Sequence, residues 1–227
     1  MDFKRANLDD CHLARGTVVV IDVLRAFSTA CYAFDAGAEE IVLASTVEEA
    51  FLLREKLQDV KIVGEQGGLP VDGFDFGNSP SELKEAALEG QQLILRTSAG
   101  TKGVLRSTNA DRILACSLCC AGATARELNR KSPREVTFVE TGVFPEEDRG
   151  DEDRVCADYI QSLLEDEAID NVTILSRVKN SVAAQPFMDL NQPDFPLTDL
   201  ELSLKVDAFD FVLEVGEKDG MLVLNAI

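Results

Sequence analysis

The chain has 227 residues, 41 acidic against 22 basic side chains, a formal net charge of −19 and 45% hydrophobic residues. This composition allows one domain or two small ones, and it excludes nucleic acid and anionic membranes as expected partners, because a strongly acidic protein repels polyanions. The N-terminus has no signal-peptide pattern and no apolar run is long enough to cross a bilayer, so we expect a cytoplasmic protein without a membrane partner.

Six cysteines lie mostly in apolar segments, which is typical of reduced, buried thiols rather than of a disulfide framework. They are Cys11, Cys31, Cys116, Cys119, Cys120 and Cys156. We expect no zinc site, because Cys116 and Cys119 have no second pair and His12 is the only histidine.

Strand-like and helix-like segments alternate along the chain. β-branched and apolar runs predict strands at 17–21, 40–44, 61–63, 92–96, 112–116, 135–139 and 172–175. The intervening patterns predict helices at 27–34, 47–57, 121–129 and 152–164. A further helix is predicted to begin at Pro80, and another to follow residues 97–101 and to end near Ser107. Residues 180–206 show a less regular pattern. The segments 209–215 and 221–224 are predicted to pair as a β-hairpin.

This alternation predicts an α/β fold with a mixed or mostly parallel sheet, helices on both faces and a C-terminal β-hairpin. We expect residues 1–227 to form a single domain, with room for two lobes that flank a cleft. A weak repeat of strand, polar loop, helix and strand occurs near 17–45, 91–117 and 135–176. Because sites in such sheets form at the carboxyl ends of strands, we expect the loops after these strands and the glycine-rich segment 64–79 to line one active-site cleft.

The glycine-rich segment places Glu65 in a turn and Asn78 and Ser79 before a helix start at Pro80. Glycines allow backbone geometry that side chains forbid, and the free N–H groups of a capped helix start can bind an anion. The alternative is an ordered loop that only caps a helix.

Asp22 and Arg25 follow the buried strand at 17–21. Asp22 could hold a metal ion or a water molecule, while Arg25, Ser28 and Thr29 could meet an anion at the helix start. The alternative is an Asp–Arg ion pair with a helix cap.

Two further motifs begin helices. Arg96 precedes Thr97-Ser98-Ala99-Gly100-Thr101, whose three hydroxyls and glycine suit an oxyanion. Glu152 and Asp153 open a long helix, where acids also favour the helix dipole without any further function. Paired carboxylates from separate loops are nevertheless what Mg²⁺ takes from proteins, with phosphate and water completing its shell.

Other phosphatase chemistries fit less of the sequence. A haloacid-dehalogenase nucleophile needs a second acid where Leu24 stands, and a histidine phosphatase needs more than one histidine. Cys120 and Arg126 do have the Cys-x5-Arg spacing of thiolate phosphatases, although Glu127 would repel phosphate there. The thiolate mechanism is therefore kept as an alternative.

The motifs together resemble the 2-phosphosulfolactate phosphatase family. The matching segments occur in the family's order: residues 19–26, 46–50, 64–65, 73–80, 97–101 with 103, 117–121, 152–153 and 156–157, with a further likeness at 207–210. The resemblance implies an α/β fold with a cleft and Mg²⁺-dependent removal of phosphate from a small sulfonated 2-phospho acid, (2R)-2-phospho-3-sulfolactate, to give 3-sulfolactate. In methanogens this step belongs to coenzyme M biosynthesis.

We combine the residue patterns with this resemblance to predict three groups of site residues. The predicted catalytic residues are Asp22, Arg25, Glu65 and Glu152. The predicted substrate-binding residues are Ser28, Thr29, Asn78, Arg96, Thr97, Ser98, Gly100, Thr101 and Ser117. The predicted metal ligands are Asp22, Glu152 and Asp153, with Mg²⁺ as the cofactor.

The sequence departs from the family pattern at Gln66, where arginine is expected, at Cys120, where asparagine is expected, and in the acidic loop Val143 to Gly150. These departures bear on the substrate, so another small phosphorylated carboxylic acid is an alternative. A non-catalytic binding protein for small anions is the rival from another class. The expected partner is a small anionic phosphorylated substrate. Both a monomer and a homodimer are compatible with the sequence.

Overall fold

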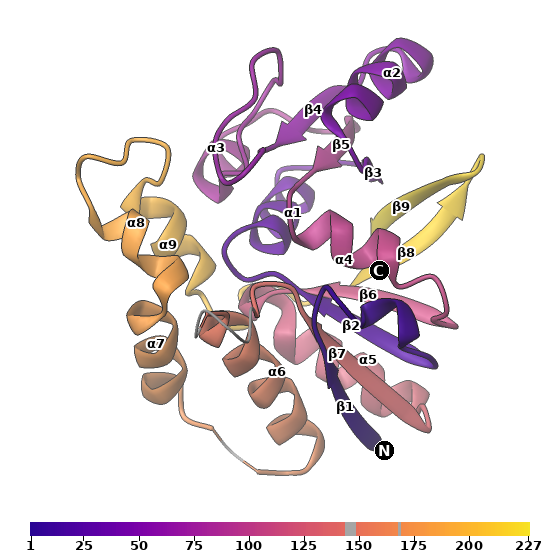
Figure 1. The fold of residues 1–227 in the computed structure, drawn as a ribbon, viewed down its shortest axis with the longest axis vertical. Coiled ribbons are helices and arrows are strands. Elements are labelled where there is room, and N and C mark those ends of the chain that lie inside the picture. Colours follow the sequence, from indigo (N-terminus) through magenta and orange to yellow (C-terminus); the bar gives the residue numbers. More distant parts are fainter. Residues whose placement is uncertain (144–148, 168) are drawn as a thin grey trace.

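The computed structural model describes residues 1–143, 149–167 and 169–227, so most of the loop Val143 to Gly150 lies outside the described residues. In the described part, nine strands form one sheet in the order β1-β7-β2-β6-β8-β9-β3-β5-β4 (Figure 1). Their bounds are β1 Asp2–Ala6, β2 Thr17–Ile21, β3 Glu40–Leu43, β4 Lys61–Gly64, β5 Gln92–Arg96, β6 Arg112–Cys116, β7 Glu135–Glu140, β8 Leu213–Lys218 and β9 Met221–Ala226.

The sheet contains two parallel groups of strands that an antiparallel hairpin joins. β1, β7, β2 and β6 are parallel to their neighbours, as are β3, β5 and β4. β8 pairs antiparallel with β6, and β9 pairs antiparallel with β3, which places the β8–β9 hairpin between the groups (Figure 1). Asp219 and Gly220 both have positive φ in its two-residue turn. The predicted α/β fold, with its mostly parallel sheet and C-terminal hairpin, is confirmed.

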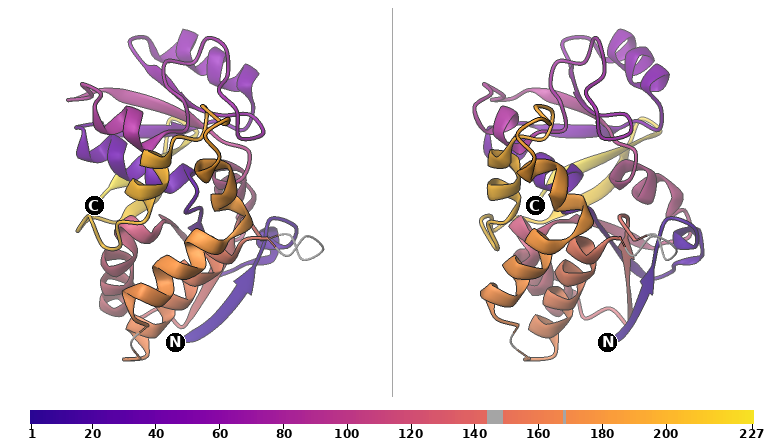
Figure 2. Two further views of the ribbon diagram at one scale, coloured as in Figure 1. Left: turned by 90° about the vertical axis from the view of Figure 1, so that its left-hand side faces the viewer. Right: turned by 60° about the vertical axis from the view of Figure 1, so that its left-hand side comes forward.

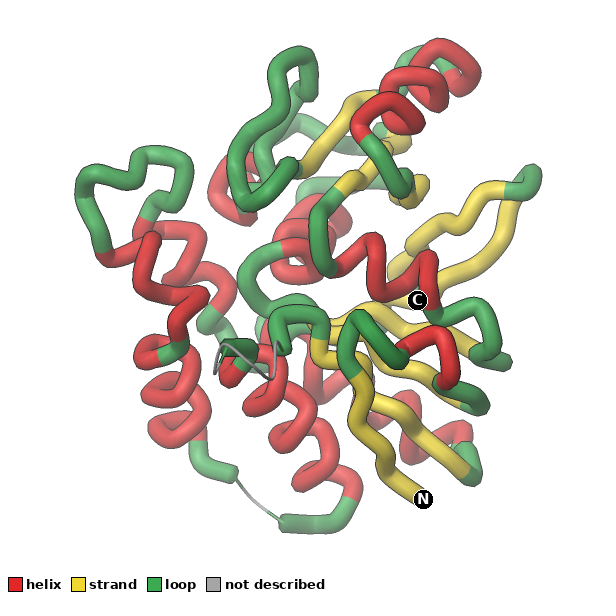
Figure 3. The backbone as a smooth tube through the Cα atoms, in the orientation of Figure 1, coloured by secondary structure: helices red, strands yellow, loops and turns green. Residues whose placement is uncertain are grey.

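Helices pack on both faces of the sheet. In β3, Ile41 and Leu43 enter the large core, whereas Val42 enters a smaller core beneath α2, because successive side chains of a strand point to opposite faces. The α-helices of the described part are α1 Ala26–Asp35, α2 Val47–Leu57, α3 Pro80–Lys84, α4 Gly100–Arg106, α5 Ala121–Lys131, α6 Asp151–Leu164, α7 Asn171–Asn180, α8 Gln185–Met188 and α9 Leu197–Ser203. Figure 2 shows α6 and α7 side by side, and Figure 3 shows α7 to α9 in a column along one flank.

Strand register aligns the carboxyl ends of the strands within each parallel group. Ile21, at the end of β2, pairs with Cys116 of β6 and with Glu140 of β7, and these strand ends form what we call the carboxyl edge. In the other group, Gly64 of β4 pairs with Arg96 of β5. The three antiparallel pairings β6–β8, β8–β9 and β9–β3 make the two groups run in opposite directions, so the tertiary fold rather than a shared sheet edge brings their loops together.

The prediction of a strand at 172–175 is wrong, because these residues belong to helix α7. The Asp170 side chain accepts a hydrogen bond of 2.9 Å from Thr173 N and caps this helix. Ile174 and Val178, four residues apart, are buried, whereas Val172 is 77% exposed. This burial has the period of a helix, which the β-branched residues of the segment conceal.

Residues 180–206 are more regular than predicted, because α8, α9 and the short turn of 3₁₀-helix Val182–Ala184 lie there. Strand β1 was not predicted; it pairs only with β7, through main-chain contacts that its polar sequence does not reveal. No helix of the described residues is long and apolar enough to span a membrane. The single-domain organisation stays a prediction.

Candidate active site

Asp22 lies where β2 ends and α1 begins. Its side chain is buried, and its Oδ1 accepts a hydrogen bond of 3.0 Å from Ala26 N in the first turn of α1. Asp22 therefore caps the start of the helix, while its other oxygen, Oδ2, faces the 97–101 loop.

Gly100 brings that loop against Asp22. A Cβ atom added to Gly100 would lie 2.8 Å from Asp22 Oδ2 and 2.6 Å from Ala26 Cβ. Only glycine permits this approach without displacing its neighbours. The two loops, predicted from distant parts of the sequence to share a cleft, thus lie side by side.

Glu152 and Asp153, at the start of α6, flank Gly142, which follows β7. A Cβ atom on Gly142 would lie 2.6 Å from Glu152 Oε1 and 3.1 Å from Asp153 Oδ2. Asp153 Oδ1 accepts a hydrogen bond of 2.8 Å from Val23 N, and its Oδ2 accepts one of 2.7 Å from Gly142 N. Asp153 therefore ties the ends of β2 and β7 together, and Glu152 is the freer of the two carboxylates.

Burial raises the pKa of all three carboxylates, and neighbouring charges add to this. Burial raises the pKa of Asp22 to about 7, and the charges of Glu65 and Glu152 add to this, against the hydrogen bonds from Ala26 and Gly100. Burial likewise raises the pKa of Glu152, and burial with the charges of Glu152 and Asp22 raises that of Asp153 well above its ordinary range. A cation would offset this repulsion.

The residues fit a magnesium ion that keeps much of its water. Glu152 Oε2 is buried and has no hydrogen-bond partner among the described residues. The described residues contain no group of three or more His, Cys, Asp or Glu side chains arranged as a complete metal site. Mg²⁺ characteristically takes one or two carboxylates and fills its shell with water and substrate oxygens, so Asp22 and Glu152 are the ligand pair that best fits it.

Glu65 folds the glycine-rich turn onto the 97–101 loop. Its Oε2 accepts hydrogen bonds of 2.6 Å from Gly68 N and 3.0 Å from Ser98 Oγ, and its Oε1 accepts one from Ser98 N. Ser98 Oγ in turn accepts a hydrogen bond of 2.8 Å from Gly67 N. Glu65 thus holds two loops together, which explains a carboxylate in a glycine-rich turn.

Thr97 and Thr101 hold the same loop from within. Thr97 N donates to Thr101 Oγ1 and Thr101 N donates to Thr97 Oγ1, each at 3.0 Å. Arg96 donates from Nη1 to the main-chain oxygen of Glu65. These contacts make the loop rigid before any substrate arrives.

Arg25 does not pair with Asp22, so the ion pair between them that the sequence left open is absent. Instead, its Nη1 donates a hydrogen bond of 2.8 Å to Asp199 Oδ2, from helix α9. The guanidinium carbon also lies 5.1 Å from the ring centre of Phe187 and 4.8 Å from that of Phe195. No sequence motif marked these three partners, because they lie more than 160 residues from Arg25.

Arg25 lines a small pocket of about 90 Å³ beside the carboxylates. Its lining comprises Arg25, Glu65, Gly68, Pro70, Gly77, Asn78, Ser79, Glu82, Pro193, Asp194 and Pro196. Asn78 is 7% exposed, and its Oδ1 is buried without a hydrogen-bond partner among the described residues. An unpaired buried amide is costly, so this side chain is available to a ligand.

Three predicted substrate-binding residues are not placed to touch a substrate. Ser28, Thr29 and Ser117 are fully buried. Ser28 Oγ donates a hydrogen bond of 2.8 Å to Val23 O, and Ser117 Oγ accepts one of 3.2 Å from Cys119 N. In Ser28 and Ser117, the hydroxyl near a helix start shapes the loop itself, whereas Thr29 Oγ1 is buried without a hydrogen-bond partner among the described residues.

The thiolate alternative fits the structure poorly. Hydrogen bonds with Cys116 and Cys31 lower the pKa of Cys120, but its side chain is fully buried. Arg126 instead pairs with Asp210 at 2.8 Å, and both side chains are exposed. Cys120 and Arg126 therefore do not form the phosphate loop that their spacing suggested.

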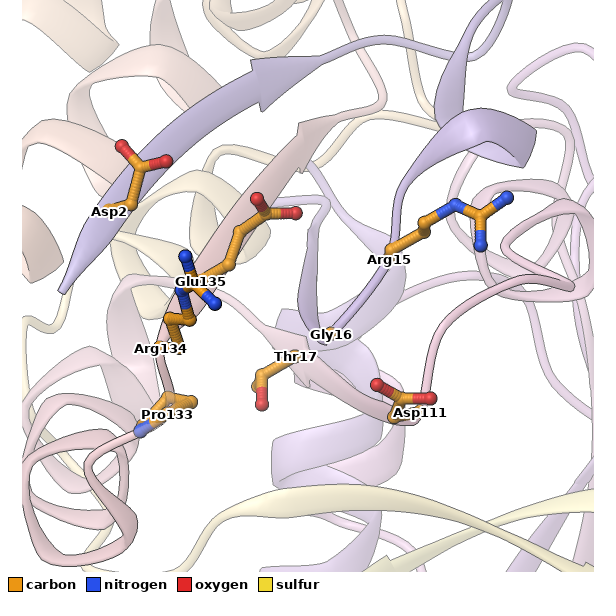
Figure 4. Close-up of a pocket in the computed structure, with 8 residues that line it drawn as sticks. All are labelled: Asp2, Arg15, Gly16, Thr17, Asp111, Pro133, Arg134 and Glu135. Atoms are coloured by element: carbon orange, nitrogen blue, oxygen red, sulfur yellow. The ribbon is translucent and has the colours of Figure 1, made fainter.

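A pocket of about 510 Å³ lies at the amino ends of β1, β2 and β7, opposite the carboxyl edge (Figure 4). Its lining comprises Asp2, Arg15, Gly16, Thr17, Asp111, Pro133, Arg134 and Glu135. Figure 4 shows Asp2 and Arg15 on opposite sides of this pocket. None of the predicted site residues lies there, and its charged groups are mostly exposed.

Comparison with known proteins identifies the family of the chain. The family model described as 2-phosphosulpholactate phosphatase matches residues 4–218. A protein named probable 2-phosphosulfolactate phosphatase from Bacillus subtilis (strain 168) is 33% identical over 203 residues, covering 89% of this chain and 87% of its own length. One of the same name from Carboxydothermus hydrogenoformans is 34% identical over 224 residues, covering 92% and 90%. As the sequence motifs predicted, the chain belongs to the 2-phosphosulfolactate phosphatase family, whose members are phosphoric monoester hydrolases.

Proposed function

We propose that this protein is a Mg²⁺-dependent phosphatase that hydrolyses (2R)-2-phospho-3-sulfolactate to 3-sulfolactate and phosphate. The observation that carries the proposal is the pair of buried carboxylates, Asp22 and Glu152, set against the rigid loop that contains Gly100. The family membership supplies the substrate class.

Asp22 and Glu152 would hold the metal, which would offset charge on the phosphate and on the two carboxylates. The 97–101 loop approaches Asp22 closely through Gly100, so a phosphate held at Asp22 would lie beside this loop and the start of α4. Asp153 and Glu65 hold the surrounding loops by hydrogen bonds to their main-chain amides. The chain thus fixes the reacting groups in advance, which is how most phosphoryl-transfer enzymes lower the barrier.

Asp22 would either attack phosphorus directly or orient the attacking water. Direct attack leaves an aspartyl phosphate, which forms when Asp22 Oδ2 displaces the alcohol oxygen and is later hydrolysed. Rapid quenching during turnover, followed by mass spectrometry of the peptide that contains Asp22, separates the two routes.

The decisive experiment measures phosphate release from a panel of phosphorylated hydroxy acids, with Mg²⁺ and with chelator. We expect 2-phosphosulfolactate to give the highest kcat/KM. Faster hydrolysis of a phosphorylated carboxylic acid without a sulfonate would instead favour a phosphatase for another small phosphorylated carboxylic acid. This second candidate is considered because the exposed Gln66 stands where arginine is expected. Binding without turnover throughout the panel would show a small-anion-binding protein instead.

We also propose a cytoplasmic location, because all six cysteines are free and buried. Disulfides are common in oxidising compartments, and six unpaired thiols suit a reducing one. Fractionation of cells that express the tagged protein tests this location.

A further inference from the structure

The pocket beside Arg25 adjoins the carboxylate site without containing it. Neither Asp22, Glu152 nor the 97–101 loop lines the pocket. Glu65 connects the two places, because it lines the pocket and accepts hydrogen bonds from Ser98 N and Ser98 Oγ in the 97–101 loop that lies against Asp22. A group that occupies this pocket would therefore be close to a phosphate held at Asp22, but it would not be the group that is transferred.

Arg25 offers this pocket a defined pair of donors. Its Nη1 is occupied by Asp199 Oδ2 at 2.8 Å and by the main-chain oxygen of Asp194 at 3.1 Å. Its Nη2 makes only a long contact of 3.5 Å, to Gly68 O, and no described residue accepts a hydrogen bond from Nε. Nε and Nη2 form the edge of a guanidinium that matches the two oxygens of a carboxylate or sulfonate.

Asp199 fixes that edge and the loop of Asn78 together. It is fully buried, and its Oδ1 accepts hydrogen bonds of 2.9 Å from Ser79 Oγ, 2.9 Å from Ser81 N and 2.6 Å from Ser81 Oγ. Its Oδ2 holds Arg25. One carboxylate thus joins the β2–α1 loop to the start of α3, and its four hydrogen bonds leave it no role of its own toward a ligand.

The local charge favours a tethered group over a free anion. Arg25 and Asp199 neutralise each other, and the lining residues Glu65, Glu82 and Asp194 are acidic. A free anion gains little there, whereas an acid group attached to a bound phosphate arrives at high effective concentration and needs only directed hydrogen bonds. A volume of about 90 Å³ suits one such group.

We propose that the pocket formed by Arg25 and Asn78 binds the substrate's non-transferred acid group, the carboxylate or the sulfonate, and that Asp199 is the positioning residue that holds the Arg25 side chain and the start of α3 next to Asn78. The proposal rests on the proposed phosphatase function. It assigns Arg25 to substrate recognition rather than to charge on the phosphoryl group.

The test compares three substrates in the wild-type protein and in Arg25→Lys. They are 2-phosphosulfolactate, 2-phospholactate, which lacks the sulfonate, and phosphorylated isethionate, which lacks the carboxylate. Arg25→Lys should raise KM for 2-phosphosulfolactate about 30- to 100-fold, with kcat and the inhibition constant of inorganic phosphate changed less than about 3-fold. One analogue should escape the rise in KM, and the group that it lacks is the one in the pocket. An equal loss on all three substrates, or weaker inhibition by phosphate, would overturn the proposal.

Asp199→Asn should reproduce this split between KM and kcat, and the double variant should be no worse than Arg25→Lys alone, because both changes act through one guanidinium. Should Asp199→Asn not fold, Ser81→Ala removes part of the link to α3 and should still raise KM about 3- to 10-fold. A parallel fall in kcat for either variant would show a merely structural role. Arg112→Lys is the matched control, since Arg112 also forms two ion pairs, with Glu127 and Glu214, at the amino end of β6.

A failure of the proposed function has a different signature, namely no hydrolysis of any of the three substrates by the wild-type protein. In that case calorimetry with 3-sulfolactate and with inorganic phosphate decides. Loss of sulfolactate binding in Arg25→Lys, with phosphate binding retained, would support the pocket. Equal sulfolactate binding in both proteins, or none in the wild type, would overturn it.

Discussion

The two edges of the sheet carry similar charged residues but bury them differently. At the carboxyl edge, Asp22, Glu152 and Asp153 are at most 6% exposed, and burial raises the pKa of each. At the amino edge, Asp2 and Asp111 are exposed beside arginines in a pocket more than five times larger than the one beside Arg25. Solvated acids cost little, whereas adjacent buried ones are costly unless a ligand offsets them. Burial of like charges, rather than pocket volume, thus distinguishes the two edges.

Removal of divalent metal should affect the carboxyl edge most. We expect hydrolysis to fall to background in chelator and to return with Mg²⁺, because unneutralised carboxylates repel the substrate. Independently of activity, Mg²⁺ should raise the melting temperature of the wild type but not that of Asp22→Asn. Undiminished hydrolysis after thorough chelation would contradict this expectation.

Asp22→Asn should have the next largest effect. The amide keeps the shape but removes the charge that holds a metal or attacks phosphorus, so we expect kcat to fall at least ~10³-fold while the protein still folds. The matched change at the amino edge, Asp111→Asn, should alter kcat less than about 2-fold. Similar losses in both variants would remove the distinction between the edges.

Gly100→Ala tests how closely the 97–101 loop must approach Asp22. The added Cβ would clash with Ala26 Cβ at 2.6 Å, so we expect a ~10- to 100-fold loss of kcat/KM and about 1–3 kcal/mol lower stability. Gly216→Ala in β8 is the control, because its nearest contact would be an ordinary 3.5 Å. Wild-type kinetics for Gly100→Ala would show that the approach is not needed.

The elements that the sequence revealed are those with a local cause. A run of buried β-branched residues marked Thr17–Ile21, and Ser79 with Pro80 marked the start of α3, whose cap is a hydrogen bond between Ser79 Oγ and Glu82 N. Asp22 and the 97–101 loop could each be placed after a strand. Their contact joins two groups of strands that run in opposite directions, so it depends on the tertiary fold. The helix α7 was not predicted, because its β-branched residues favour a strand. Its helical burial pattern is set by tertiary packing.

The partners of Arg25 could not be predicted in this way. Asp199 and Phe195 lie in a segment without strong periodicity, and their role depends on how α8 and α9 fold back over the start of α1. Ser28 and Ser117 show the converse, because a hydroxyl near a helix start serves the loop as readily as a ligand.

The pH dependence of stability should also differ between the edges. Burial raises the pKa of Asp22 from 3.8 to about 7, so between these values the folded state binds more protons than the unfolded state. The free energy of unfolding of the metal-free protein should therefore fall as pH rises from 4 to 7, and Glu152 and Asp153 act in the same direction.

Thermal melting in chelator at pH 5 and pH 8 measures this fall. Asp22→Asn should reduce this fall in the free energy of unfolding by about 1 kcal/mol or more, roughly 2–4 °C in Tm. Asp111→Asn should keep the same pH dependence of stability as the wild type. A wild-type protein that is more stable at pH 8 than at pH 5 would show the opposite sign and refute the account.

The smallest effect on activity is expected at Cys120, which belongs to neither edge but to the core behind the site. Its sulfur lies 4.0 Å from Cys116 Sγ, its side chain is fully buried, and Arg126 does not approach it. Cys120→Ser should therefore change kcat/KM less than about 3-fold, while the hydroxyl in an apolar site lowers stability by about 1–2 kcal/mol. A thiolate nucleophile would instead lose nearly all turnover, because serine attacks far less readily. Measured beside Asp22→Asn, the variant decides whether the reacting group lies among the carboxylates at the sheet edge or among the thiols beneath it.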